Sequence, residues 1–212
     1  SYAQLLLSET APDDPKYKLL KKMEQQSFRA SHLVNSLLDL IANRPRSREL
    51  VSIPELVTAT VALHEDLMNA KSARVHVGDM PPLLVRGNFH DLQQVLTNIL
   101  LNARDAIAKG GNIWIDVADV EERVVIKVRD QRGGVRPDLL DRISEPLMTT
   151  KRGQGGTGLG LAISRRIVSA SDGDITVRNV AGQGAEFSVS LPPVKVGRDV
   201  MPSVGDPSLR SG

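Results

Sequence analysis

The chain has 212 residues, no cysteine and a formal net charge of +2, which leaves room for one large or two small domains and excludes disulfide scaffolds and thiolate metal sites. No basic stripe with interleaved aromatic residues occurs, which argues against nucleic-acid binding. No apolar run has the length of a membrane span, so we expect no membrane contact by this chain. The lack of cysteine fits a reducing, cytoplasmic compartment. Because the sequence starts within a helical pattern and without Met, we expect a segment of a longer protein, and a membrane-associated parent stays compatible with it.

Two helices joined by a proline-containing turn are predicted for residues 1–44. Residues 1–9 end a helix, Pro12 and Pro15 interrupt it, and residues 17–43 form a long amphipathic helix. The apolar residues of this long helix recur at three- and four-residue spacings: Leu20, Met23, Phe28, Leu33, Leu37, Leu38 and Ile41. Such a hairpin cannot bury its whole apolar face alone, so we expect a partner hairpin. The polar, proline-containing segment 44–48 marks the domain boundary.

Residues 49–192 are predicted to form a second domain in which strands and helices are mixed. Helices are expected at 53–72, 88–109, 137–143 and 158–171, and strands at 74–77, 83–86, 113–117, 124–128, 175–177 and 187–191. Such a mixture, ending in antiparallel hairpins, indicates an α+β sandwich with helices on one face of a mixed sheet. Residues 193–212 are polar and rich in Gly, Pro and Ser, and we expect them to be disordered.

Polar residues line one narrow stripe of the predicted helix 88–109: Asp91, Gln94, Asn98, Asn102 and Asp105. Asn is a poor helix former because its side chain competes for backbone hydrogen bonds, so two such residues in mid-helix argue against a merely solvated face. A row of amide and carboxylate oxygens suits a hard cation such as Mg²⁺, which takes substrate phosphates as part of its shell. From the residues alone, both interpretations remain open.

Two further segments carry possible binding residues. Asp130 ends an alternating strand and is followed by Gly133 and Gly134; alone, this pattern favours an ordinary strand-ending turn. Residues 153–160 then form a glycine-rich loop that leads directly into an amphipathic helix. Backbone N–H groups at such a helix start can cradle phosphate oxygens, and Lys151 and Arg152 precede the loop. A flexible linker is the alternative, but it would not lead so abruptly into a helix.

The three segments together, in this order, resemble the ATP-binding domain of sensor histidine kinases and their relatives of the gyrase, Hsp90 and MutL type. The resemblance covers residues 1 to about 192 and is strongest to kinases of the nitrogen-regulation type. It implies a dimerising four-helix bundle made from two hairpins of residues 1–44, followed by an ATP-binding domain at 49–192. It also implies ATP and Mg²⁺ as cofactors.

By the same resemblance, Asn102 is the principal Mg²⁺ ligand with Asn98 as its helper, Asp130 accepts a hydrogen bond from the adenine amine, and Lys151 meets the phosphates. The implied nucleotide site consists of Asn98, Asn102, Asp105, Asp130, Gly134, Lys151, Gly156, Thr157, Gly158, Leu159 and Gly160. Asn98, Asn102 and Lys151 would serve phosphoryl transfer. The implied reaction moves the ATP γ-phosphoryl group to a histidine, for relay to the receiver domain of a response regulator.

The chain also departs from the family pattern. Arg132 stands where the family usually has the first glycine after the adenine aspartate, and the box at 143–151 has Ser144, Leu147 and Met148 in place of phenylalanines. None of the four histidines, His32, His64, His76 and His90, lies in the acceptor pattern. We therefore expect the acceptor histidine to lie outside this chain. A degenerate, non-catalytic scaffold and an ATPase of the gyrase and Hsp90 type remain alternatives.

Overall fold

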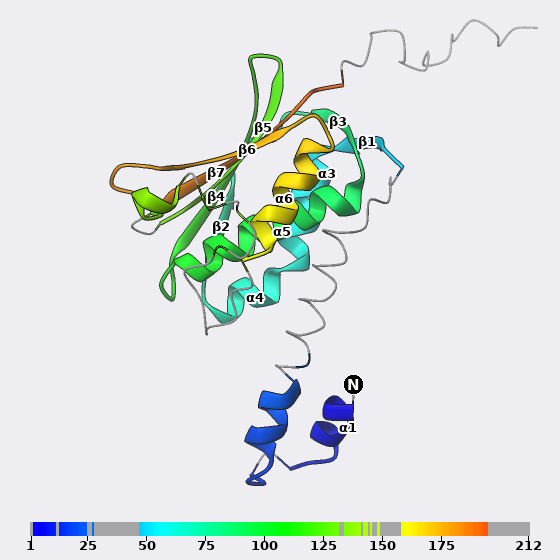
Figure 1. Cartoon of the computed structure of the whole chain (residues 1–212), viewed down its shortest axis with the longest axis vertical. Coiled ribbons are helices and arrows are strands. Elements are labelled where there is room, and N and C mark those ends of the chain that lie inside the picture. Colours follow the sequence, from blue (N-terminus) through cyan, green and yellow to red (C-terminus); the bar gives the residue numbers. More distant parts are fainter. Residues whose placement is uncertain are drawn as a thin grey trace, which may run out of the picture.

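The computed structural model describes residues 2–11, 13–24, 27, 47–131, 134–140, 142–143, 145, 148 and 158–194. From residue 49 onward these residues build two layers, a five-stranded mixed sheet and a set of helices that covers one of its faces (Figure 1). The helices are α1 (Tyr2–Ser8), α3 (Ile53–Leu63), α4 (Glu65–Ala70), α5 (Phe89–Ala106) and α6 (Gly160–Ser169), with one 3₁₀ turn, η1 (Pro137–Leu139). The strands are β1 (Glu49–Ser52), β2 (Arg74–Val77), β3 (Leu84–Gly87), β4 (Asn112–Val120), β5 (Arg123–Asp130), β6 (Asp174–Asn179) and β7 (Ala185–Leu191). The expected α+β class with helices on one face is confirmed.

The main sheet has the order β2-β4-β5-β7-β6, in which β2 runs parallel to β4 and the other neighbours are antiparallel. The apolar residues of β4 and β5 alternate along each strand and meet across the pair, as Ile115 does with Val128 and Val117 with Ile126. Because side chains alternate between the two faces of a strand, this period places them all on the helix-covered face. The two-residue turn at Glu121 and Glu122 has positive φ at both positions, 51° and 59°, which matches the twist of a tight hairpin.

The central helix is α5, whose apolar arc packs on this sheet. Asn88 caps its first turn by accepting a hydrogen bond from the Asp91 N–H at 3.2 Å. The predicted arc is buried at Leu92, Val95, Leu96, Ile99, Leu100, Ala103 and Ile107. Helices α3 and α6 lie beside α5 on the same face (Figure 1). The polar stripe of α5 is therefore held at a fixed angle to the start of α6.

The structure differs from the predicted elements at three places. The single helix expected at 53–72 is two helices, because His64 leaves the helical conformation with φ −112° and ψ 12°. The helix expected at 137–143 is helical only as the 3₁₀ turn η1. Strand β1 was not predicted, and it forms a small antiparallel sheet with β3.

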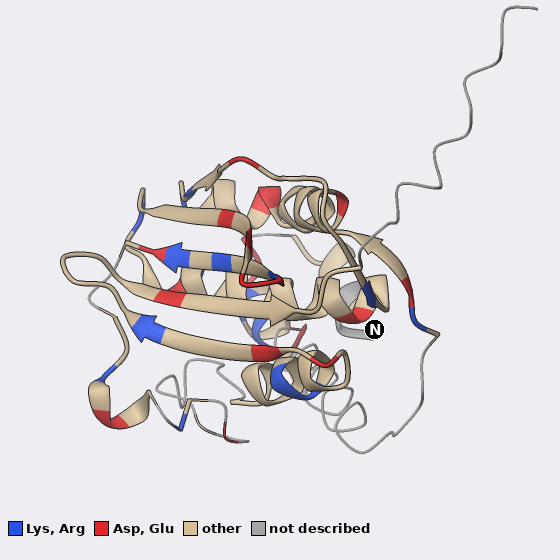
Figure 2. Ribbon diagram, turned by 90° about the horizontal axis from the view of Figure 1, so that it is seen from above, with Lys and Arg blue, Asp and Glu red and all other residues tan. Residues whose placement is uncertain are grey.

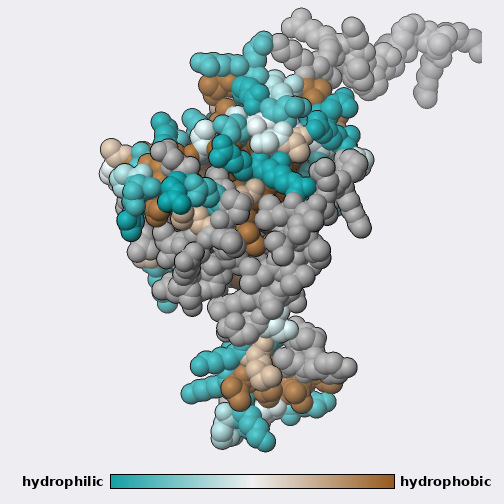
Figure 3. Space-filling view, viewed as in Figure 1, coloured by the Kyte–Doolittle hydropathy of each residue, from teal (hydrophilic) through white to brown (hydrophobic). Residues whose placement is uncertain are grey.

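The described N-terminal residues comprise α1 and a helical stretch at 17–24. Four of their large apolar side chains are exposed, Leu5, Leu6, Leu19 and Met23, and the lower body of the molecule in Figure 3 shows hydrophobic surface accordingly. The rest of the helix predicted to end at Asn43 lies outside the described residues, so its extent stays a prediction. The domain boundary at 44–48 and the disorder of the tail also stay predictions, since residues 195–212 are not described.

The distribution of charged residues does not distinguish one face of the described domain from another. Over the described ribbon, basic and acidic residues are interspersed along the strands and helices (Figure 2). Within the described part of the chain, no helix combines the length and apolar character needed to cross a bilayer.

Candidate nucleotide-binding site

Asn98 connects the polar stripe of α5 to the beginning of α6. Its side-chain Nδ2 donates hydrogen bonds to the Gly160 carbonyl at 3.0 Å and to the Ser164 hydroxyl at 3.1 Å. The buried Ser164 hydroxyl in turn donates to the Gly160 carbonyl at 2.9 Å. Because the Gly160 carbonyl can only accept, these contacts fix the Asn98 amide with its nitrogen toward α6. The Oδ1 carbonyl is left as the end that can face a cation.

Asn102 and Asp105 follow on the same stripe but differ in surroundings. Asn102 is half-buried one turn after Asn98, and among the described residues no side chain or backbone group is hydrogen-bonded to its amide. Asp105 is exposed, and its carboxylate pairs with its neighbour Arg104 at 2.6 Å. The structure therefore brings Asn98 and Asn102 together on one side of α5, and it gives Asp105 a local partner.

Asp130 is buried at the end of β5, with only 3% of its surface exposed. It lies opposite Ile113 of β4 in the sheet register, and its backbone carbonyl accepts a hydrogen bond from the Gly184 N–H at 3.1 Å. Burying a carboxylate costs free energy unless polar groups surround it. Burial therefore distinguishes Asp130 from an aspartate in an ordinary, solvent-exposed turn. The sheet ladder and the β6–β7 hairpin together fix its backbone.

The segment after Asp130 is held at both of its described ends. The Gln131 side-chain oxygen accepts from the Asn112 backbone N–H at 3.1 Å and from Asn112 Nδ2 at 2.7 Å. Further on, the Asn179 amide accepts from the Val135 N–H at 2.8 Å and donates to the Val135 carbonyl at 2.7 Å. Gly134 sits next to this pair with φ +81°, in the left-handed region. Arg132 and Gly133 lie outside the described residues.

Three predicted loop residues are described at the start of α6. Gly158 has φ +67°, Leu159 is buried, and the Leu159 carbonyl accepts the first helical hydrogen bond, from the Ile163 N–H at 2.9 Å. Gly160 begins the helix directly against the Asn98 amide: a Cβ there would lie 3.4 Å from the amide carbon and oxygen of Asn98. Position 160 therefore lies within contact distance of the Asn98 amide. Lys151, Gly156 and Thr157 lie outside the described residues, so their placement in the site stays a prediction.

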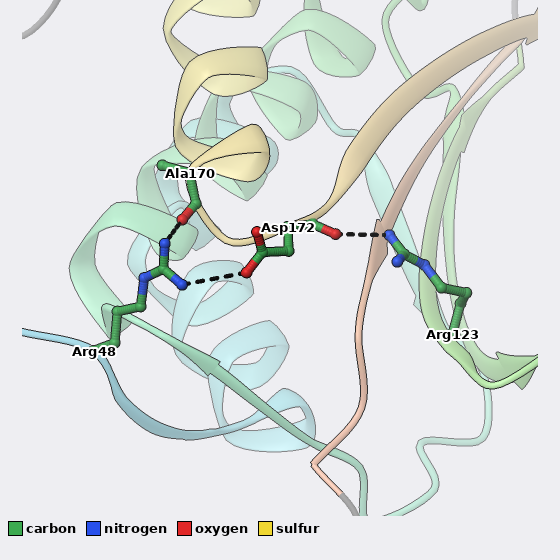
Figure 4. A network of polar contacts seen from close by, with 4 residues as sticks. All are labelled: Arg48, Arg123, Ala170 and Asp172. Atoms are coloured by element: carbon green, nitrogen blue, oxygen red, sulfur yellow. Dashed lines mark hydrogen bonds and ion pairs between the residues drawn. The ribbon is translucent and has the colours of Figure 1, made fainter.

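Sequence reasoning missed a polar network at the other end of α6. Arg48 donates hydrogen bonds to the Ala170 carbonyl and, at 3.3 Å, to the Asp172 carboxylate, while Arg123 donates to the Asp172 backbone carbonyl at 3.2 Å (Figure 4). A cation at the carbonyl end of a helix is favourable, because it meets the unpaired carbonyls and the negative end of the helix dipole. The contact joins the segment before β1 to α6, and only the tertiary fold reveals it.

The described histidines, His64, His76 and His90, each contact another side chain of the domain. His64 Nε2 lies 3.0 Å from the Thr97 hydroxyl, and partial burial followed by the nearby Arg104 charge lowers the pKa of His64. His76 stacks on Trp114 with ring centroids 5.7 Å apart, and His90 meets Phe89 edge to face. His32 lies outside the described residues.

The described part of the chain thus contains an amide-lined helix whose Asn98 contacts the start of α6, a helix start bounded by glycine and, at the end of β5, a buried aspartate. Residues 87–195 match the family described as histidine kinase-, DNA gyrase B-, and HSP90-like ATPase, and the chain belongs to this family. Within it, the domain is a catalytic ATP-binding domain of the histidine kinase type.

Individual relatives point in the same direction. The sensor histidine kinase ZraS of Salmonella typhi is 29% identical over 192 residues, which is 90% of this chain and 41% of ZraS. Full-length ShkA, solved with AMPPNP, has a TM-score of 0.73 and 27% identity over 89% of this chain and 41% of that one. The nucleotide-free catalytic domain of the histidine kinase ThkA has a TM-score of 0.62 and 26% identity over 69% of this chain and 96% of that one. ThkA has also been crystallised with the response regulator TrrA; that structure is 21% identical and shows the shared fold. This chain therefore spans about two fifths of the length of ZraS.

Proposed function

We propose that this chain binds Mg²⁺ and ATP between α5, the end of β5 and the start of α6, as the catalytic part of a sensor histidine kinase. The γ-phosphoryl group of ATP would pass to a histidine outside this chain, for relay to an aspartate on a response-regulator receiver domain. The single observation that carries the proposal is the hydrogen bond from Asn98 to Gly160. It sets the oxygen-bearing stripe of α5 against the helix that follows the glycine loop.

The residues present fit the proposed cofactors. With its nitrogen committed to α6, Asn98 has its carbonyl oxygen for a hard cation, and Asn102 offers a second amide oxygen one turn later. Among the described residues, no three His, Cys, Asp or Glu side chains gather in a way that would hold a metal ion, so a cation here would draw its negative ligands from the nucleotide phosphates. Bound Mg²⁺ would supply charge neutralisation on those phosphates. The protein's own share is to orient the nucleotide and exclude water.

The other parts of the proposal concern the assembly. We propose that residues 1–44 are a dimerisation hairpin, that 49–192 are the ATP-binding domain and that 193–212 are a tail. The exposed leucines of the N-terminal helices support a homodimer, since a second hairpin would cover them. The response-regulator partner is suggested by the complex of ThkA with TrrA. The parent protein would act in the cytoplasm or at its membrane.

Calorimetric titration with ADP and a non-hydrolysable ATP analogue, with and without Mg²⁺, tests this function. The Asn102→Ala variant should lose the Mg²⁺-dependent part of binding while its circular dichroism stays unchanged. Asp130→Asn should weaken ADP binding about tenfold or more, because one hydrogen bond lost with its partner left buried costs roughly 1–3 kcal/mol. A parent chain that binds no nucleotide would establish the scaffold alternative. Steady hydrolysis of ATP with no phosphohistidine formed on an added acceptor would favour the ATPase alternative.

A further inference from the structure

The loop that follows Asp130 is attached to a hairpin distant in sequence. We define the adenine loop as residues 131–135. In Figure 1 the short helical turn η1, just beyond this loop, lies next to the β6–β7 hairpin. The hairpin makes two separate contacts with the chain around the loop: Gly184 donates to the Asp130 carbonyl, and Asn179 bonds to Val135. One rigid element thus supports both the aspartate and the far end of the loop.

The Asn179 contact is specific to an amide side chain. Asn179 is the last residue of β6 and lies opposite Ala185 in the sheet register, so its backbone is fixed by the ladder. Its amide both accepts from and donates to Val135, which is the exchange that two residues of neighbouring strands make. Because the Val135 N–H requires an oxygen and the Val135 carbonyl requires an N–H, only one orientation of the amide satisfies both. An ionised carboxylate, which can only accept, does not reproduce this pairing.

Gly134 is shaped to the same contact. A Cβ at position 134 would lie 2.7 Å from the Asn179 amide carbon, a distance that requires one of the two to move. The positive φ of Gly134 adds a second restriction, because left-handed backbone strains any residue with a Cβ. The family resemblance places this glycine in the nucleotide site. The structure supplies a reason within the protein: glycine lets the Asn179 amide reach the Val135 backbone.

We propose that Asn179 is a positioning residue for the nucleotide site, fixing the closing end of the adenine loop and so setting both the affinity and the base preference of the site. The inference rests on the proposed function, since it assumes that the purine lies beside Asp130. A loop anchored only at Gln131 would have to be ordered by the nucleotide itself, and that ordering would reduce affinity. With Asn179 in place, Val135 is already held at the far end of the loop in the nucleotide-free protein.

The test compares four variants with the parent chain: Asn179→Ala, Asn179→Asp, Gly134→Ala and the double variant with Ala at both positions. Asn179→Asp matches the parent in size and keeps the acceptor for the Val135 N–H, but turns an oxygen toward the Val135 carbonyl. Thr176→Ala is the matched control, because Thr176 is an exposed residue of the same strand. Calorimetric titrations use ADP and GDP, and hydrogen exchange of the nucleotide-free proteins follows the Val135 amide.

We expect Asn179→Ala and Asn179→Asp to raise the ADP dissociation constant roughly threefold to tenfold, the range that one or two exposed hydrogen bonds provide. The preference for ADP over GDP should narrow, and the Val135 amide should exchange faster. Gly134→Ala should weaken binding less in the Asn179→Ala background than in the parent, because the amide that it displaces is already gone. Thr176→Ala should leave all of these readouts unchanged.

Two results would overturn the inference. Unchanged ADP affinity and base preference in both Asn179 variants would show that the loop does not need this anchor. Additive effects of the Gly134 and Asn179 changes would show that the two residues do not act through each other. A parent chain that binds neither ADP nor GDP would instead refute the proposed function, and the positioning role would fall with it even if Val135 exchange still responded to the Asn179 variants.

Discussion

Replacing Asn98 with Asp separates two roles that this residue would have. The change preserves size and keeps an oxygen available for a cation, but it removes the Nδ2 donor that bonds to Gly160 and Ser164. A carboxylate oxygen would then face the Gly160 carbonyl at about the distance that the nitrogen now has. The buried Ser164 hydroxyl can donate to only one of these oxygens. The α5–α6 contact should therefore weaken while the cation-binding capacity remains.

The size of the effect follows from the two hydrogen bonds that the Asn98 amide nitrogen donates. At about 0.5–1.5 kcal/mol each, their removal lowers the free energy of unfolding by roughly 1–3 kcal/mol. For a chain of this size, each kcal/mol lowers the melting temperature by about 2–4 °C, so we expect a fall of roughly 2–12 °C. The affinity for Mg²⁺ with ADP should not fall in parallel, since a carboxylate is at least as good a ligand for a hard cation as an amide oxygen.

Urea unfolding measures the stability change. Trp114 is the only tryptophan and lies on β4, stacked with His76 and with the Arg129 guanidinium 5.0 Å from its ring centre. Its fluorescence therefore reports on the sheet, and coincidence with circular dichroism checks two-state behaviour. Asn102→Asp is the matched control on the same helix, and its stability should change by less than about 0.5 kcal/mol. An Asn98→Asp variant as stable as the parent, or equal losses of stability at both positions, would refute the argued role of the Asn98 contact.

Two further predictions concern stability. The folded-state pKa of His64 lies below its ordinary value of 6.5, so the unfolded chain binds the proton more readily and the parent should lose stability as the pH falls through that value. The melting temperatures at about pH 5.5 and about pH 7.5 should therefore differ less in His64→Gln than in the parent. An equal difference in both proteins would contradict this. Gly173→Ala should lower the free energy of unfolding by about 3 kcal/mol, because its Cβ would lie 2.7 Å from Val168 Cγ1 and would also meet the Ser190 carbonyl. Gly182→Ala, which has open space around it and φ +70°, should lower it by only about 1 kcal/mol. The same urea titration measures both.

Periodicity was sufficient to predict most of the layered fold. The apolar residues of β4 and β5 and the buried arc of α5 could be read from their spacing, since strands and helices bury a face with fixed periods. Strand β1 was not predicted because it is only four residues long and buries a single residue, Val51. One buried residue gives no alternating pattern. The break at His64 also carried no sequence signal, because neither Pro nor Gly marks it. Such features are decided by tertiary packing.

The candidate site was predictable only in part, for a similar reason. The sequence shows polar residues at positions where helix or strand propensity favours other residue types. These are Asn98, Asn102 and Asp130. The hydrogen bond from Asn98 to Gly160 spans 62 positions, and that from Asn179 to Val135 spans 44. No local sequence pattern predicts which distant residue will be the hydrogen-bond partner of such a side chain. The Mg²⁺ ligation, the adenine contact of Asp130 and the roles of Lys151, Gly156 and Thr157 stay predictions.

Strand β3 lies between β1 and the last described residues of the chain. Leu84 of β3 pairs with Ser52 of β1, and the Leu84 carbonyl accepts a hydrogen bond from the Val194 N–H at 2.8 Å. Ser52 and Val194 therefore lie on opposite sides of β3, about 10 Å apart across the strand, and Glu49 lies three residues further along β1. Ends this close make the domain a natural candidate for circular permutation: the 49 and 194 positions can be joined by a short linker and the chain reopened at the tight turn of Glu121 and Glu122.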